Sequence, residues 1–113
     1  DYRRRYEGGV WERDSGYHQG PVWAWLLGHY AVAVLRVTGD AARAQSVLEP
    51  VRDHLFDAGL GTVSEIFDGD PPHHPRGAPA QAWSGACGLA AWSAIQAVKG
   101  GTRTAPTALS AAA

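Results

Sequence analysis

The stretch Gly20–Gly39, "GPVWAWLLGHYAVAVLRVTG", decides the fold class of this chain. Its first glycine is a plausible N-cap, Pro21 suits the first helical position, and its last glycine is a typical stop signal, so we predict a helix over residues 21–37. Arg36 carries the only formal charge in this helix. A helix that is apolar nearly all round has to be surrounded by protein, because it has no polar face for water.

The next stretch, residues 40–59 with the sequence "DAARAQSVLEPVRDHLFDAG", predicts an amphipathic helix that begins at Asp40 as its N-cap. Apolar residues recur at three-and-four spacing, and the charged residues lie on the other faces. Pro50 is expected to kink this helix or split it in two, since a proline in a helix interior costs about 3 kcal/mol and removes a hydrogen bond.

A third helix is predicted from about Ala80 to Lys99, without a charge before its last residue and with two glycines after it. We predict a loop over residues 1–19 and a short extended piece at residues 62–67. The low-complexity sequence of residues 100–113 predicts a disordered tail. The predicted fold class is therefore all-α, with residues 1–99 belonging to one domain.

The order of these helices has a geometric consequence for the loops around them. Consecutive helices that pack through short turns alternate in direction, so the first and third should run parallel, with both N-termini at one rim. Three helices cannot bury two that are apolar all round. We therefore expect further helices from a missing upstream part of the same polypeptide, and an α/α toroid would meet that need, with this chain supplying three to four helices and a long functional loop.

Composition excludes several classes of partner. The net charge of -1 among 113 residues leaves no basic surface for nucleic acid or an anionic membrane, and no apolar run is suited to crossing a bilayer. Cys87 is the only cysteine and is expected to be a buried, inert thiol, which fits a reducing, cytoplasmic compartment. The chain has no methionine, which suggests that something lies upstream.

The shared rim would gather aromatic rings, carboxylates, amides and an arginine. This combination suits a sugar, whose C–H faces pack on rings while its hydroxyl groups form hydrogen bonds. For any single tryptophan on an apolar helix, a place in the core is the more common role. The rim residues therefore indicate a carbohydrate site only when they are taken together.

Glu65 is the best candidate for acid–base chemistry, because it lies in a loop where a carboxylate can face a cleft. Asp68 and Asp70 flank a glycine before two prolines, and ordinary turn chemistry is the favoured interpretation of both. His73 and His74, which follow, are expected to be exposed loop residues. The spacing of histidines and aspartates matches no zinc or calcium signature, so no metal is expected.

Three motifs together resemble a known family. "YHQGPVWAWLLGHY", then "GLGTVSEIFDGD", then "RGAPAQAWS" are similar to the C-terminal amylo-alpha-1,6-glucosidase region of glycogen debranching enzymes, and more distantly to the glucoamylase-like (α/α)6 glycosidases. The resemblance covers about residues 6–95. Departures from the family pattern, at Ala24 and at the two adjacent histidines, remove no group that the chemistry requires.

The resemblance implies an (α/α)6 barrel that hydrolyses α-1,6-glucosidic branch points in glycogen or limit dextrins, with inversion and without a cofactor. It implies that Glu65 is the general base, that the general acid lies upstream, and that this chain alone is inactive. The residues implied to line the glucose subsite are Tyr17, His18, Gln19, Trp23, Asp68, Asp70, Arg76, Gln81 and Trp83.

Two alternatives stay open at this point. The chain could belong to a sugar-binding or structural module that keeps the aromatic rim without catalysis. It could also belong to a hydrolase of another specificity on the same toroid, such as a trehalase-like, glucoamylase-like or mannosidase-like enzyme.

Overall fold

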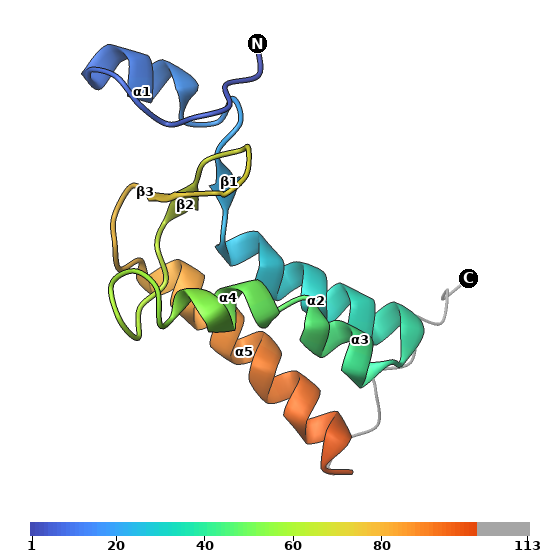
Figure 1. The fold of residues 1–113 in the computed structure, drawn as a ribbon. Coiled ribbons are helices and arrows are strands. Elements are labelled where there is room, and N and C mark those ends of the chain that lie inside the picture. Colours follow the sequence, from blue (N-terminus) through green and yellow to red (C-terminus); the bar gives the residue numbers. More distant parts are fainter. Residues whose placement is uncertain (102–113) are drawn as a thin grey trace.

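The computed structural model describes residues 1–101 and is built on two parallel helices, α2 (Trp25–Thr38) and α5 (Ala82–Lys99). Trp25 at the start of α2 stacks on Trp83 at the start of α5, and from this end the two helices run in the same general direction and pack against each other (Figure 1). Gly28 permits this closeness, because a Cβ at this position would collide with the backbone of Cys87. The predicted parallel arrangement is confirmed.

The amphipathic region folds as two short helices, α3 (Ala41–Ser46) and α4 (Glu49–His54). Asp40 caps α3 by accepting a hydrogen bond from the Arg43 N–H at 2.9 Å. Pro50 lies in the first turn of α4, where its missing N–H is not needed, so the predicted split is confirmed.

The core lies where α2, α3 and α5 meet. Its buried members are Ala31, Val34, Leu35, Ala44, Leu48, Ala91 and Ile95. Within α2 and within α5 these side chains recur at the three-and-four spacing that places residues on the same side of a helix, and Leu48 lies just after α3.

The all-α prediction is wrong in one respect, because a small antiparallel sheet lies beside the helices. It consists of β1 (Val22–Trp23), β2 (Ile66–Phe67) and β3 (Pro75–Arg76), in that order. Val22 pairs with Phe67 in β2, and Ile66 pairs with Arg76 in β3. The extended piece expected over residues 62–67 therefore contains a strand.

The start of the first predicted helix is also corrected. The helix begins at Trp25, after Ala24 as N-cap, instead of at Pro21. Residues 22 and 23 pair with a strand more than forty positions away, and this distant pairing overrides the local start signal. Gly39, with φ at 69°, ends α2 as predicted.

A further helix, α1 (Val10–Gly16), lies in the part of the chain that was predicted to be a loop. It lies beyond the sheet from α2 and α5, so that the sheet separates it from the N-terminal ends of the two long helices (Figure 1). The predicted rim, where α2 and α5 both begin, thus exists. The loop before α2 and the loop before α5 are joined there by the pairing of β1 with β2.

Several large apolar side chains lie open on the long helices. Leu26 and Tyr30 on α2 and Leu89 on α5 are each about half exposed or more. The prediction that α2 is surrounded by protein is thus met on one face only. No helix within residues 1–101 has both the length and the hydrophobicity needed to cross a membrane. The predicted disordered tail falls almost wholly on residues 102–113, which lie outside the described residues.

Candidate functional site

Glu65 lies immediately before β2, and its carboxylate is held from both sides. Oε1 accepts a hydrogen bond from the Tyr17 hydroxyl and another, 3.4 Å long, from the Gln81 side-chain amide. Oε2 accepts a hydrogen bond from the Ala78 backbone N–H at 3.0 Å. The Glu65 N–H in turn donates to the Ala78 carbonyl at 3.0 Å. Two parts of the chain, at residue 17 and at residues 78–81, therefore fix the orientation of this carboxylate.

Gly77 sits against the same carboxylate. Its φ of 67° is in the left-handed region, which favours glycine. A Cβ at this position would collide with Glu65 Oε2, so the site also requires glycine for space.

Tyr17 follows α1 and is the only phenol bonded to Glu65 among residues 1–101. Burial, the hydrogen bond to Glu65 and the negative charge of that carboxylate together raise the pKa of Tyr17 to about 12. The phenol is therefore protonated at neutral pH and donates its hydrogen to Glu65. Its ring packs edge-on against Trp23 at 4.7 Å and tilted against Tyr6 at 5.7 Å.

Two pairs of aromatic rings stack face to face where the long helices begin. His18 stacks on Trp23 with centroids 5.0 Å apart, and Trp25 stacks on Trp83 at 4.2 Å. Trp83 is 52% exposed, so it offers a ring to a ligand. Trp23 Nε1 is buried and has no hydrogen-bond partner within the described part of the chain.

Asp68 is buried, with a side chain only 3% exposed, and its oxygens bind protein groups. Arg76 donates to both of them from Nε and Nη2 at 2.9 to 3.2 Å, and the Tyr6 N–H donates to Oδ1 at 2.8 Å. Burial raises the pKa of Asp68, but the hydrogen bonds from Arg76 and Tyr6 and the charge of Arg76 outweigh it, so the pKa lies below its ordinary value.

Residues 2–6 are held at both ends. Asp68 binds the Tyr6 end of this segment, and Asp70 binds the Tyr2 end. The Tyr2 hydroxyl donates to Asp70 Oδ1 at 2.7 Å, and Arg4 Nε lies 3.5 Å from Oδ2. The backbone of residue 4 also accepts from the N–H groups of Gly69 and Asp70. The turn around Gly69 thus serves as a clamp for residues 2–6.

The structure therefore separates most of the predicted site residues into two groups. Tyr17 and Gln81 each donate a hydrogen bond to Glu65, with Trp23 and His18 packed behind. Asp68 and Asp70 hold residues 2–6, and Arg76 pairs with Asp68. Gln19 is exposed, and its backbone carbonyl accepts the Arg3 N–H at 2.6 Å.

Sequence reasoning missed Tyr6, Ala78 and the whole of residues 2–6 as parts of this site. No local pattern marks them, because their partners lie 13 to 68 positions away. Gly77, next to the predicted Arg76, was the only visible signal, as a glycine between polar site residues.

Two further histidines bond to groups of the protein. His54 is buried, and its Nε2 accepts the Ser64 N–H at 3.2 Å. His73 is exposed, with Nδ1 3.0 Å from the Asp68 carbonyl oxygen. Across residues 1–101, no group of three or more His, Cys, Asp or Glu side chains is arranged to hold a metal ion.

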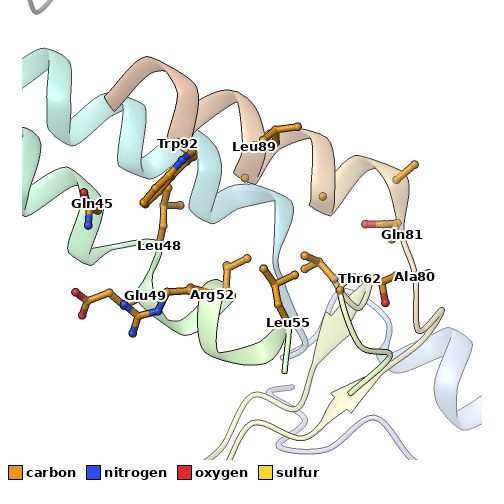
Figure 2. Close-up of a pocket in the computed structure, with 16 residues that line it drawn as sticks. Gln45, Leu48, Glu49, Arg52, Leu55, Thr62, Ala80, Gln81, Leu89 and Trp92 are labelled. Carbon is orange, nitrogen blue, oxygen red and sulfur yellow. The ribbon is translucent and has the colours of Figure 1, made fainter. Parts of the chain in front are cut away.

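A hollow on the chain does not include Glu65 in its lining. It is a groove of about 830 Å³ between α5 and the pair α3 and α4, walled mainly by apolar side chains such as Leu48, Leu55, Leu89 and Trp92 (Figure 2). Gln81 is the one predicted site residue among its walls.

Taken together, these features define a mainly helical protein with a carboxylate fixed among a phenol, an amide and tryptophan rings where two parallel helices begin. The family model described as Amylo-alpha-1,6-glucosidase matches residues 1–90, and the chain belongs to that family. The match supports the resemblance to the C-terminal region of glycogen debranching enzymes. Neither a curated protein nor a solved structure matches the chain significantly.

Proposed function

We propose that this chain is the general-base half of a glycoside hydrolase that cleaves α-1,6-glucosidic branch points in glycogen or limit dextrins, with inversion and without a cofactor. The observation that carries the proposal is the fixed carboxylate of Glu65 in a chain of the amylo-alpha-1,6-glucosidase family. In this mechanism a base deprotonates the water that attacks the anomeric carbon from the face opposite the leaving oxygen.

The geometry around Glu65 suits a base. A carboxylate has about four lone-pair sites, and the described contacts occupy three of them. The remaining site is available to accept a proton from a bound water. Tyr17 and Ala78 hold one oxygen each, which limits rotation of the carboxylate and keeps the free site in one direction.

The substrate is proposed to lie along the aromatic rim. Trp83 and His18 are exposed and offer flat surfaces to a glucose ring, while Gln19 and Gln81 offer amides to its hydroxyl groups. Tyr17 and Trp23 form the wall behind them.

The general acid is proposed to come from upstream helices of the same polypeptide that complete an (α/α)6 toroid, in a cytoplasmic protein. The open groove of Figure 2 and the exposed apolar side chains on α2 and α5 support such helices, because an apolar surface of this extent is usually covered. We call the chain together with these helices the complete polypeptide.

The test is glucose release from a branched limit dextrin by the complete polypeptide. We expect Glu65→Gln to lower kcat roughly 10²- to 10⁴-fold, the usual contribution of a general base. Glu12→Gln, an exposed carboxylate on α1, is the matched control and should keep normal activity. Turnover of Glu65→Gln near the normal rate would rule out the proposed role.

Two measurements separate the alternatives. A sugar-binding module would bind the dextrin without releasing glucose, and a hydrolase of another specificity would prefer linear α-1,4 dextrins or a different glycoside. NMR of the first product should show β-glucose if the reaction inverts, and initial α-glucose would contradict inversion.

A further inference from the structure

The ion pair of Asp68 and Arg76 supports both sides of the Glu65 carboxylate without touching it. On one side, Asp68 accepts the Tyr6 N–H, and the Tyr6 ring packs on the Tyr17 ring, whose hydroxyl binds Glu65 Oε1. On the other side, Arg76 is followed by Gly77 and Ala78, and the Ala78 N–H binds Glu65 Oε2. One buried aspartate therefore connects to both supports.

The environment of Asp68 fits a supporting role better than a sugar contact. Its side chain is 3% exposed, so a glucose hydroxyl has no direct path to it. Both of its oxygens already accept hydrogen bonds from the protein, and a paired guanidinium with a backbone N–H offsets the cost of its buried charge.

The sheet makes the support rigid. Arg76 pairs with Ile66, the residue after Glu65, and the Asp68 N–H donates to the His74 carbonyl at 2.9 Å. A movement of Asp68 would therefore shift the strand that positions Ala78 as well as the segment that carries Tyr6.

We propose that Asp68 and Arg76 are positioning residues, which clamp residues 2–6 and the turn after β3 so that Tyr17 and Ala78 hold the carboxylate of Glu65. The proposal rests on the proposed function for its kinetic consequences. Its structural content, the dependence of the bond between Tyr17 and Glu65 on Asp68, does not.

The kinetic test is a double-mutant cycle in the complete polypeptide. Asp68→Asn should lower kcat roughly 10- to 100-fold, because a small displacement of a catalytic group has an effect of that order. KM and inhibition by free glucose should change less than about twofold. The double variant Asp68→Asn with Arg76→Gln should be no slower than Asp68→Asn alone, since the pair acts as a unit.

Asp53→Asn is the matched control, because Asp53 also pairs with an arginine, Arg52 at 2.8 Å, but on the exposed surface of α4. This variant should keep normal kinetics. If Asp68→Asn instead raises KM and weakens glucose inhibition, and the losses of the two single variants add, both residues contact the sugar and the proposal is wrong.

A spectroscopic readout separates this proposal from the proposed function. In a protein labelled with ¹³Cζ-tyrosine, the Tyr17 signal should titrate at a lower pH in Asp68→Asn than in the wild type, because the phenol moves away from Glu65. An unchanged Tyr17 titration would overturn the positioning role even if the protein releases glucose. A shifted titration in a protein that releases none would contradict only the proposed function.

If Asp68→Asn fails to fold, kcat and the Tyr17 titration are measured in Arg76→Lys instead. It keeps the positive charge beside Asp68 but loses the two-point contact of the guanidinium. We expect a smaller fall in kcat and a smaller shift of the Tyr17 titration, in the same direction. No change in either would overturn the proposal.

Discussion

At the scale of single residues, the site depends on groups whose properties are set by their neighbours. Tyr17 is a phenol that remains protonated well above neutral pH, because burial and the adjacent carboxylate both disfavour its anion. Gly77 is a residue whose missing side chain makes room for an oxygen of Glu65. Each of these residues leads to a testable prediction.

The pKa of Tyr17 should be about 12, above the ordinary value of 10.0. In Glu65→Gln the negative charge is lost, so we expect a fall toward 10.0, although burial should keep the pKa above that value. The measurement is the pH titration of the ¹³Cζ signal, identified by its absence in Tyr17→Phe.

The sign of the effect on stability follows from the direction of this shift. Between about pH 10 and 12 the folded chain binds more protons than the unfolded chain, so the free energy of unfolding should fall as the pH rises through this window. Below pH 10 the contribution is fully present. Tyr17→Phe should lose this part of the pH dependence, and a wild-type Tyr17 that titrates near 10 would contradict the prediction.

Gly77→Ala should disturb the Glu65 carboxylate directly. The left-handed φ alone should lower the free energy of unfolding by about 1–2 kcal/mol. In addition, the new Cβ would displace Glu65 Oε2, so glucose release by the complete polypeptide should fall sharply.

Gly39→Ala separates these two effects. Gly39 has nearly the same φ, 69°, but a Cβ there would meet nothing within 4 Å. We expect a similar loss of stability, measured by chemical denaturation, with normal activity. Equal activity in the two variants would show that the space beside Glu65 is not important.

At the scale of elements, the contact between α2 and α5 aligns the two loops that form the site. Both helices begin at the same rim, and the stacked tryptophans at their first turns lie beside the sheet. Because each loop leads directly into one of these helices, a change in their spacing would move Tyr17 relative to Glu65.

Gly28→Ala should therefore destabilise the chain, because the new Cβ would meet the backbone of Cys87, which cannot rotate away. Overpacking of this kind costs about 1–3 kcal/mol, and over most of this range the cost is larger than the roughly 1 kcal/mol that alanine gains over glycine in a helix. The measurement is chemical denaturation followed by circular dichroism.

Gly85→Ala is the control within α5, since a Cβ at this position would meet nothing within 4 Å. It should raise the free energy of unfolding by up to about 1 kcal/mol. If both variants are stabilised, the close approach of the two helices is not a constraint on the fold.

At the scale of the whole molecule, the described chain leaves apolar surface uncovered. Leu89 is 67% exposed and Trp92 is 42% exposed, and both line the groove between α5 and the pair α3 and α4 (Figure 2). The proposed toroid would cover this surface with further helices.

The chain expressed alone should therefore bind a hydrophobic dye such as ANS strongly, and the complete polypeptide should bind it weakly. Leu89→Lys should weaken dye binding by the isolated chain and destabilise the complete polypeptide, because the charge would be buried there. Strong dye binding by the complete polypeptide would show that the groove remains open.

The sequence by itself determined the three main helical regions, the break at Pro50, the stop at Gly39, the family and the candidacy of Glu65. These features depend on local signals, such as caps, breakers, periodicity and short motifs, which are complete within a few residues. The parallel direction of the first and third helices followed from their order and their short connections.

Only the tertiary structure decided the small sheet, the start of α2 at Trp25 and the partners of each site residue. Tyr17 and Glu65 are 48 positions apart, and Tyr6 and Asp68 are 62 apart. Such pairs form because packing brings distant segments together and every buried polar group then needs a partner, a condition that no local pattern records. For this reason the sequence could single out Asp68 as a site candidate but could not show that its side chain is buried and bound to Arg76 and Tyr6.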